Sequence, residues 1–166
     1  YGPFGELVYT KDGDGIVTTA EYDVFGNKTK MVDPDKGTWT YVYNAYGELE
    51  TQTDARGMII KNTYDGLGRL KTRTDNLGKS SESTTTWNYD TATNGLGLLE
   101  SVTHGSSTSY KQKFEYDSLS RPKTSTVTID GISTVSSVTY DEFSRPKIVT
   151  YPGGAVSVVN EYHPNL

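Results

Sequence analysis

Short runs of apolar and polar residues alternate along this chain, and residues 58–75 show the pattern most completely. Residues 58–64 are rich in strand-forming side chains. Residues 69–74 alternate strictly, with aliphatic and threonine side chains on one side and three cations on the other, which predicts a half-buried strand. Turn residues at 65–68 join the two runs, and a second turn follows at 76–78. The unit is therefore strand, tight turn, strand, turn.

This unit recurs, because tyrosines mark its copies at steps of 21 to 27 residues. These tyrosines are Tyr1, Tyr22, Tyr43, Tyr64, Tyr89, Tyr116, Tyr140 and Tyr162. Such a period indicates a repeat array, in which one small unit is copied and stacked. We divide residues 1–166 into about seven units without a separate domain. They start near residues 1, 22, 43, 64, 89, 116 and 140, with a partial unit from 162 and an insertion at residues 91–95.

The turn after each tyrosine has its own chemistry. Asp or Asn at its first position and Gly at its fourth fit a type I turn, in which the first side chain binds local backbone N–H groups. The Gly can then adopt the left-handed conformation that forms a bulge. This pattern occupies residues 23–26, 44–47 and 65–68. The third position is apolar, and we expect Phe25, Tyr46 and Leu67 to fold back toward the preceding tyrosine or onto a neighbouring repeat.

Two later turns have Ser where the others have Gly, at Ser120 and Ser144. A left-handed residue other than Gly costs about 1–2 kcal/mol. Arg-Pro follows in both cases, and neither Pro122 nor Pro146 can donate to a strand ladder. We therefore expect these two hairpins to use a modified turn.

No window of a dozen residues has a helical period free of Gly and Pro, so the chain is predicted to be all-β. Repeated antiparallel hairpins would give about 14–16 strands at about 4.8 Å each, a sheet about 70 Å wide. Open sheets of more than about ten strands tend to curl. Since the apolar residues are too few for a thick core, we expect one long, curved or spiral sheet in a single layer.

Composition narrows the class of protein. The 166 residues carry a net charge of −5, and the 13 tyrosines argue against disorder. The absence of cysteine excludes disulfides and thiolate zinc sites. No block of Lys and Arg indicates a nucleic-acid partner, and no apolar run is long enough for membrane insertion. Because the pattern is under way at Tyr1 and restarts at Tyr162, we expect this chain to be a piece of a longer protein.

Residues 22–27, 64–70 and 140–146 resemble the YD repeats of Rhs proteins. Five units keep the Tyr-Asp pair itself, at Tyr22, Tyr64, Tyr89, Tyr116 and Tyr140. The resemblance covers essentially the whole chain. In bacterial toxin complexes and Rhs polymorphic toxins, such repeats form a spiral β-sheet shell, like a cocoon, around a C-terminal toxin. Teneurins, on animal cell surfaces, have a similar barrel.

The resemblance implies a structural segment, an arc of an Rhs-type β-cocoon in a secreted or cell-surface protein. Its partners would be the remainder of the parent shell and the enclosed toxin domain. No toxin domain and no match to the family's self-cleaving aspartate segment is present, so only structural residues are transferred. We accordingly expect no enzyme activity, no catalytic residues, no metal site and no cofactor.

Other interpretations of the sequence compete with that of a structural segment. The turn at residues 12–15 weakly resembles a calcium loop, but Ile16 and Val17 stand where that loop needs Asp or Asn and Gly. The turn at residues 33–35 is treated in the same way. His104 and His163 lie in turn contexts, so catalysis by a Ser/His/Asp set is not favoured.

Aromatic repeats also suit a carbohydrate-binding or cell-surface adhesion array, in which Trp39, Trp87 and the tyrosines would stack on glycans. An enzyme would need a pocket confined to one repeat, and the insertion at residues 91–95 is the place to search for it. A sheet cut from a spiral would also expose two unpaired edges, so edge-to-edge self-association is expected.

Overall fold

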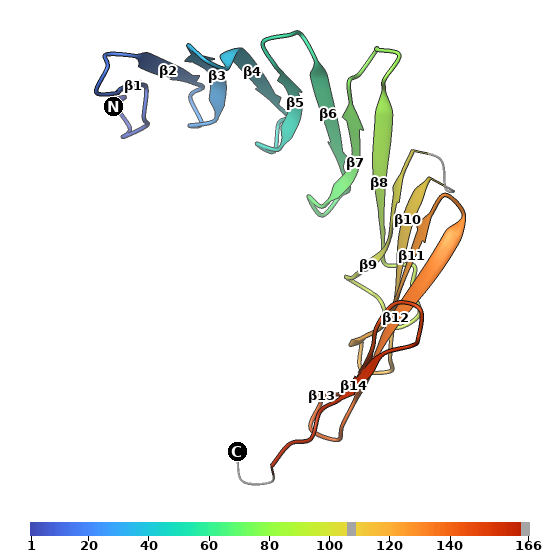
Figure 1. The fold of residues 1–166 in the computed structure, drawn as a ribbon. Helices are drawn as coiled ribbons and strands as arrows, with labels where there is room; N and C mark the ends of the chain where they lie inside the picture. Colours follow the sequence, from blue (N-terminus) through green and yellow to red (C-terminus); the bar gives the residue numbers. More distant parts are fainter. Residues whose placement is uncertain (106–108, 164–166) are drawn as a thin grey trace. The chain divides into compact units, whose positions relative to one another are not determined.

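The computed structural model describes residues 1–105 and 109–163, and that part of the chain consists of strands joined by turns and loops (Figure 1). The strands form one sheet of fourteen, in which their order follows the chain. All of the described strand pairs are antiparallel. The all-β hairpin fold predicted from the sequence is confirmed. Curvature of the whole sheet stays a prediction. Contacts divide the chain into two compact units, residues 1–84 and 85–166.

The first unit contains seven complete strands, and Figure 1 shows β2 to β7 side by side. Each strand pairs with the one that precedes it in the chain. The strands are β1 (Tyr9–Lys11), β2 (Val17–Tyr22), β3 (Lys28–Asp33), β4 (Gly37–Tyr43), β5 (Leu49–Thr53), β6 (Ile59–Tyr64) and β7 (Leu70–Asp75).

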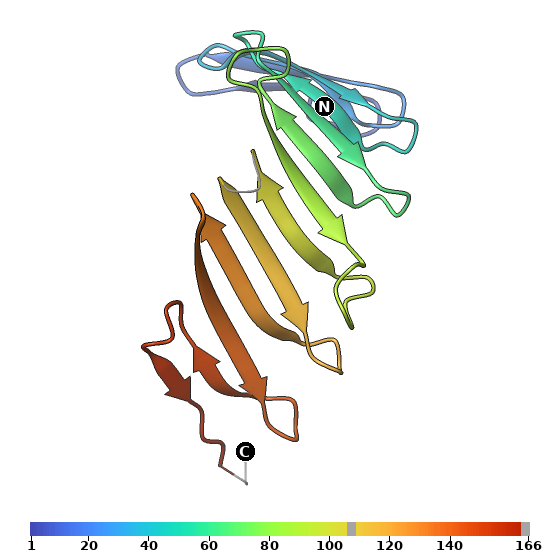
Figure 2. The same cartoon turned by 90° about the vertical axis from the view of Figure 1, so that its right-hand side faces the viewer.

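The second unit repeats this arrangement, and its strands form a single layer (Figure 2). The strands are β8 (Ser83–Tyr89), which begins at the boundary, β9 (Leu99–His104), β10 (Tyr110–Tyr116), β11 (Pro122–Ile129), β12 (Ile132–Tyr140), β13 (Pro146–Thr150) and β14 (Ser157–Val159). Asp130 and Gly131 join β11 to β12 with φ angles of 49° and 81°. Positive φ at both residues is the requirement of a two-residue hairpin turn.

A motif tyrosine ends every second strand, and the strand register shifts there. The shifts lie at Glu21/Tyr22, Val42/Tyr43, Thr63/Tyr64, Asn88/Tyr89, Glu115/Tyr116 and Thr139/Tyr140. A β-bulge of this kind adds one unpaired residue and increases the local twist. In Tyr22, Tyr43, Tyr64, Tyr116 and Tyr140 the hydroxyl at this bulge reaches the hairpin that precedes it.

The fold lacks a hydrophobic core in the ordinary sense. No hydrophobic side chain among the described residues is fully buried, and Ser101, 2% exposed, is the one buried polar side chain in that set. Strand ladders and side-chain bonds between hairpins must therefore supply much of the stability. Within the described residues there is also no helix with the length and hydrophobicity needed to cross a bilayer.

Candidate functional site: the hairpin turn and its tyrosine clamp

The turn after each motif tyrosine is organised by the side chain of its first residue. At residues 23–27, Asp23 N–H donates to the Asn27 carbonyl at 2.9 Å, and Gly26 N–H donates to the Asp23 carbonyl at 3.1 Å. Asp23 Oδ1 accepts the N–H groups of Phe25 and Asn27, both at 2.9 Å. Gly26 has a φ of 82°. The turn chemistry predicted from the sequence, including the left-handed Gly, is confirmed.

Eight turns share this pair of backbone hydrogen bonds. Their first residues are Gly2, Asp12, Asp23, Asn44, Asp54, Asp65, Asp117 and Asp141. Hydrogen bonds to a carboxylate favour its ionised form. The Asn27 side chain lowers the pKa of Asp23, and the Arg121 side chain lowers the pKa of Asp117, with partial burial opposing the shift in both. These carboxylates are therefore anionic acceptors at neutral pH.

In three turns the fifth residue is an arginine that pairs with the first. Arg121 Nε and Nη2 both bind Asp117 Oδ2, at 2.7 and 2.6 Å. The other pairs are Arg69 with Asp65 and Arg145 with Asp141. The guanidinium groups of Arg121 and Arg145 also lie over the ring of the next motif tyrosine.

Motif tyrosines bind the preceding hairpin through their hydroxyl groups, and we call this contact the tyrosine clamp. Tyr64 donates to the Leu49 carbonyl at 2.8 Å, and Leu49 directly follows the fifth residue of the preceding turn. Equivalent bonds join Tyr22 to Leu7 (3.1 Å), Tyr43 to Lys28 (3.1 Å), Tyr116 to Leu99 (2.7 Å), Tyr140 to Pro122 (2.7 Å) and Tyr162 to Pro146 (2.7 Å). Burial raises the pKa of Tyr64 and Tyr116. Both hydroxyls therefore remain protonated donors at neutral pH.

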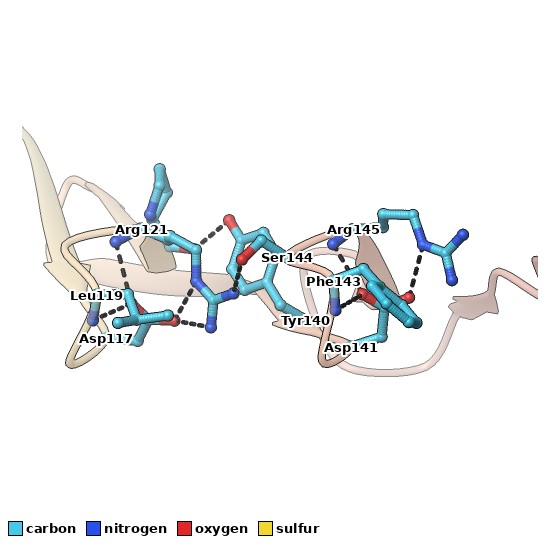
Figure 3. A network of polar contacts seen from close by, with 9 residues as sticks. Asp117, Leu119, Arg121, Tyr140, Asp141, Phe143, Ser144 and Arg145 are labelled. Atoms are coloured by element: carbon cyan, nitrogen blue, oxygen red, sulfur yellow. Dashed lines mark hydrogen bonds and ion pairs between the residues drawn. The ribbon is translucent and has the colours of Figure 1, made fainter.

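Arg121 connects two successive turns of the second unit (Figure 3). Besides binding Asp117, its guanidinium lies 4.2 Å from the centroid of the Tyr140 ring. Its Nη1 donates to Ser144 Oγ at 2.9 Å. Arg145 repeats the stacking part of this contact, with its guanidinium 4.1 Å from the Tyr162 ring centroid. Cation–π stacking of this kind stabilises by roughly 0.5–2 kcal/mol.

The expectation of a modified turn at Ser120 and Ser144 is wrong. Both turns close with the same backbone bonds as the Gly turns, and the two serines have φ angles of 59° and 63°. The proline that follows each arginine is the first residue of a strand, a position that tolerates a missing N–H. The strain at Ser144 is offset by the hydrogen bond from Arg121, a contact that Gly could not make.

The expectation that the apolar tip residues fold back is also wrong. Phe25 is 85% exposed, Tyr46 89% and Leu67 77%. The equivalent residues of the second unit, Leu119 and Phe143, are exposed as well. The tight turn points the third side chain away from the strands, so each unit presents apolar side chains along one row of hairpin tips.

In the acidic turns considered for calcium, the first carboxylate binds backbone N–H groups of its own turn. Asp12 Oδ1 accepts the N–H groups of Asp14 and Ile16, at 3.0 and 2.8 Å. Asp33 Oδ1 binds two backbone N–H groups in the same manner. No cluster of three or more metal-ligating side chains occurs in residues 1–105 and 109–163.

The two histidines are not brought together with a nucleophile and a carboxylate. His104 ends β9 and lies with its Nδ1 2.8 Å from Thr85 Oγ1, and His163 is exposed after β14. Trp39 and Trp87 are half-buried on strands, and Trp39 Nε1 donates to the Lys36 carbonyl. The absence of catalysis stays a prediction.

The insertion at residues 91–95 does form a groove, of about 540 Å³. Its acidic and basic lining residues are Glu100, Lys113, Glu115, Asp117 and Lys123, and Tyr116 lines it as well. Gly95 is required there, because a Cβ would lie 2.8 Å from the Ala92 Cβ. Glu100 accepts a hydrogen bond from Ser101, and Glu115 accepts one from Thr124. Arg121 likewise holds Asp117, so the three acids of this groove have structural partners.

Sequence reasoning found the turns but missed the bond between turns. The signal was present in the Ser-Arg-Pro pattern at residues 120–122 and 144–146. Arginine at the fifth position of one turn pairs with serine at the fourth position of the next, which only the strand register reveals. The whole arrangement is suited to holding hairpins side by side.

No protein-family model and no curated protein matches the sequence. Solved structures do match its fold. A chain of the Tc holotoxin pore of Photorhabdus luminescens matches over 95% of this chain, with a TM-score of 0.73 and 14% identity. Chains of two TcdB2-TccC3 crystal structures cover 91% and 81%, with TM-scores of 0.69 and 0.62 and identities of 14% and 19%.

This chain spans less than a tenth of the length of each matched chain, 8–9%. At such low identity the likeness concerns the fold alone. The chain therefore has an Rhs-like fold, an open antiparallel sheet of consecutive hairpins that is similar to a part of these Tc toxin chains.

Proposed function

We propose that this chain is a structural wall segment of a larger Rhs-like protein and that it helps to enclose a toxin domain C-terminal to the repeats. The wall has no catalytic chemistry of its own. Its partners are the rest of the parent shell and the enclosed domain, and its location is outside the producing cell, secreted or at the cell surface.

One observation is the main support for this proposal. The tyrosine clamp recurs from hairpin to hairpin with donor–acceptor distances of 2.7 to 3.1 Å, while no hydrophobic side chain in the described part is fully buried. A thin sheet held by local contacts can extend to any length without a growing core. That property suits a wall, and stability in such arrays is approximately a sum over units and their neighbours.

The test uses the parent protein with residues 22–63 removed. This deletion removes Tyr22 and ends just before Tyr64, so Tyr64 takes the place of Tyr22 after Glu21 and the remaining hairpins keep their pairing pattern. We expect faster protease digestion of the enclosed domain, because the wall loses two hairpins. Tyr46→Phe, a change at an exposed tip, is the matched control. An enclosed domain that stays equally protected after the deletion would contradict the proposal.

A second candidate function, binding of glycans at a cell surface, is favoured by the exposed aromatic tips Phe25 and Tyr46. Rings on a polar surface are common anchors for sugars and other amphipathic ligands. A glycan array screened with this chain separates the two functions, since a wall segment alone needs no specific sugar.

Self-association through edges belongs to the same proposal. The edge strands β1 and β14 are exposed along their whole length. Unpaired strand edges template pairing with another chain. Sedimentation over a range of concentrations should detect association, and a strict monomer throughout would refute it.

A further inference from the structure

Two neighbouring hairpin tips of the first unit enclose a groove of about 760 Å³. Its walls come from the turns at residues 23–27 and 44–47, and its floor from the adjoining ends of β3 and β4. Four aromatic side chains line it: Phe25, Tyr41, Tyr43 and Tyr46. The two at the tips, Phe25 and Tyr46, are almost fully exposed. A groove of this size is in the usual range for small-molecule sites.

The polar groups of the groove are mainly neutral. Asn27, Asn44 and Thr29 lie among the aromatic rings, and Asp23 is the one ionisable acid in the lining. Asn27 Nδ2 donates to Asp23 Oδ2 at 3.0 Å, which orients the amide. The Asn27 Oδ1 has no protein partner among the described residues and is not buried. The site thus offers ring faces beside oriented hydrogen-bonding groups.

This chemistry excludes several ligand classes. A peptide that binds by adding a β-strand would need an unpaired strand edge, but β3 and β4 are paired on both sides. Phosphate-rich ligands would meet the Asp23 carboxylate, and no Lys or Arg is among the lining residues, although Lys28 lies against the lining ring of Tyr41. A cationic ligand would compete with Lys28, whose Nζ already lies 5.2 Å from the Tyr41 ring centroid.

We propose that this groove binds a linear, neutral oligosaccharide, with sugar rings stacked on Phe25 and Tyr46. The inference rests on the second, carbohydrate-binding candidate and is independent of the wall function. Stacking uses the apolar face of each sugar, while the Asn27 Oδ1 accepts a hydrogen bond from a sugar hydroxyl group.

The presence of a second, adjacent groove favours a chain-like ligand rather than a single sugar. It lies one hairpin further along, measures about 500 Å³, and shares Tyr46 and Asn44 with the first groove. Equivalent sites in successive hairpins are two strands apart, about 9.6 Å. The second groove has Leu67 where the first has an aromatic tip, so binding is centred on the first. Longer oligosaccharides should bind more tightly until both grooves are filled.

The experiment measures binding of β-linked glucose and N-acetylglucosamine tetrasaccharides to the full chain by saturation-transfer NMR and calorimetry. We expect millimolar or tighter binding of at least one series. Phe25→Ala and Tyr46→Ala should each weaken it by about 2- to 12-fold, which corresponds to the loss of one aromatic contact of about 0.5–1.5 kcal/mol. Phe143→Ala, an exposed tip in the second unit, is the matched control and should leave binding unchanged.

Three results would overturn the proposal: no binding of either series at millimolar concentration, equal weakening by Phe143→Ala, or displacement of the sugars by an apolar peptide. Thermal unfolding of each variant verifies that the fold is intact. None of these results bears on the protease-protection test, so failure of the saccharide site and failure of the wall function remain distinguishable.

Discussion

Replacement of Tyr64 by Phe removes a single clamp hydroxyl and keeps the aromatic ring. The hydroxyl donates to the Leu49 carbonyl at 2.8 Å, and Asn62 Nδ2 donates to the same oxygen at 3.0 Å. Because Asn62 continues to satisfy that carbonyl, the change does not leave an unpaired acceptor. The expected cost is therefore the net value of one neutral hydrogen bond, about 0.5–1.5 kcal/mol. For a chain of this size, 1 kcal/mol corresponds to roughly 2–4 °C in Tm.

Thermal unfolding followed by circular dichroism measures the shift, and hydrogen exchange locates it. Strands contact only their sequence neighbours, so faster exchange should be confined to β4 to β7 and leave β10 to β13 unchanged. Tyr46→Phe is the control, because Tyr46 is 89% exposed and its hydroxyl has no hydrogen-bond partner in the described part of the chain. Equal Tm values for the two variants, or uniform loss of protection across both units, would refute the clamp.

Three further predictions concern the turns. Ser120→Gly should raise Tm by relieving about 1–2 kcal/mol of left-handed strain, whereas Ser144→Gly should gain less, because it also loses the bond from Arg121; differential scanning calorimetry compares the two. Gly37→Ala should destabilise more than Gly26→Ala, since a Cβ at residue 37 would lie 2.5 Å from the Ala55 Cβ, which cannot move without its backbone, and one at residue 26 meets nothing within 4 Å; urea unfolding ranks them. The lowered pKa of Asp117 stabilises the fold above the unfolded value of about 3.9, and this contribution is lost as pH falls through that value toward the folded pKa; Tm between pH 6 and 2 should fall less steeply in Asp117→Asn.

The strands and turns could be predicted from the sequence because their causes are local. Asp23 binds N–H groups two and four residues away, and Gly26 adopts a conformation that any Gly permits. The alternation at residues 69–74 likewise reports the two faces of a single strand, β7. None of these features depends on where distant residues lie, so composition and spacing suffice.

The contacts between hairpins could not be predicted, because they depend on register over longer separations. Arg121 and Ser144 are 23 residues apart, and only the pairing of β11 with β12 and of β12 with β13 brings their turns together. The prediction that the apolar tip residues fold back was wrong for a related reason. Apolar character at Phe25 suggested burial, but a single-layer sheet has no second layer to bury it.

The carboxylate of this turn can belong to its first residue or to its fifth. The turn geometry therefore persists although the residues at these positions vary. At residues 44–48, Asn44 Oδ1 accepts the N–H groups of Tyr46 and Glu48 at 2.9 and 3.0 Å, while Glu48 Oε2 accepts the Asn44 amide at 2.6 Å. At residues 2–6 the first residue is Gly2, and there Glu6 Oε2 accepts the Phe4 N–H at 3.0 Å. Either arrangement satisfies turn N–H groups that would otherwise lack a protein acceptor. The pairing of first and fifth positions, rather than the Tyr-Asp dipeptide alone, is therefore the physical unit that repeats along this chain.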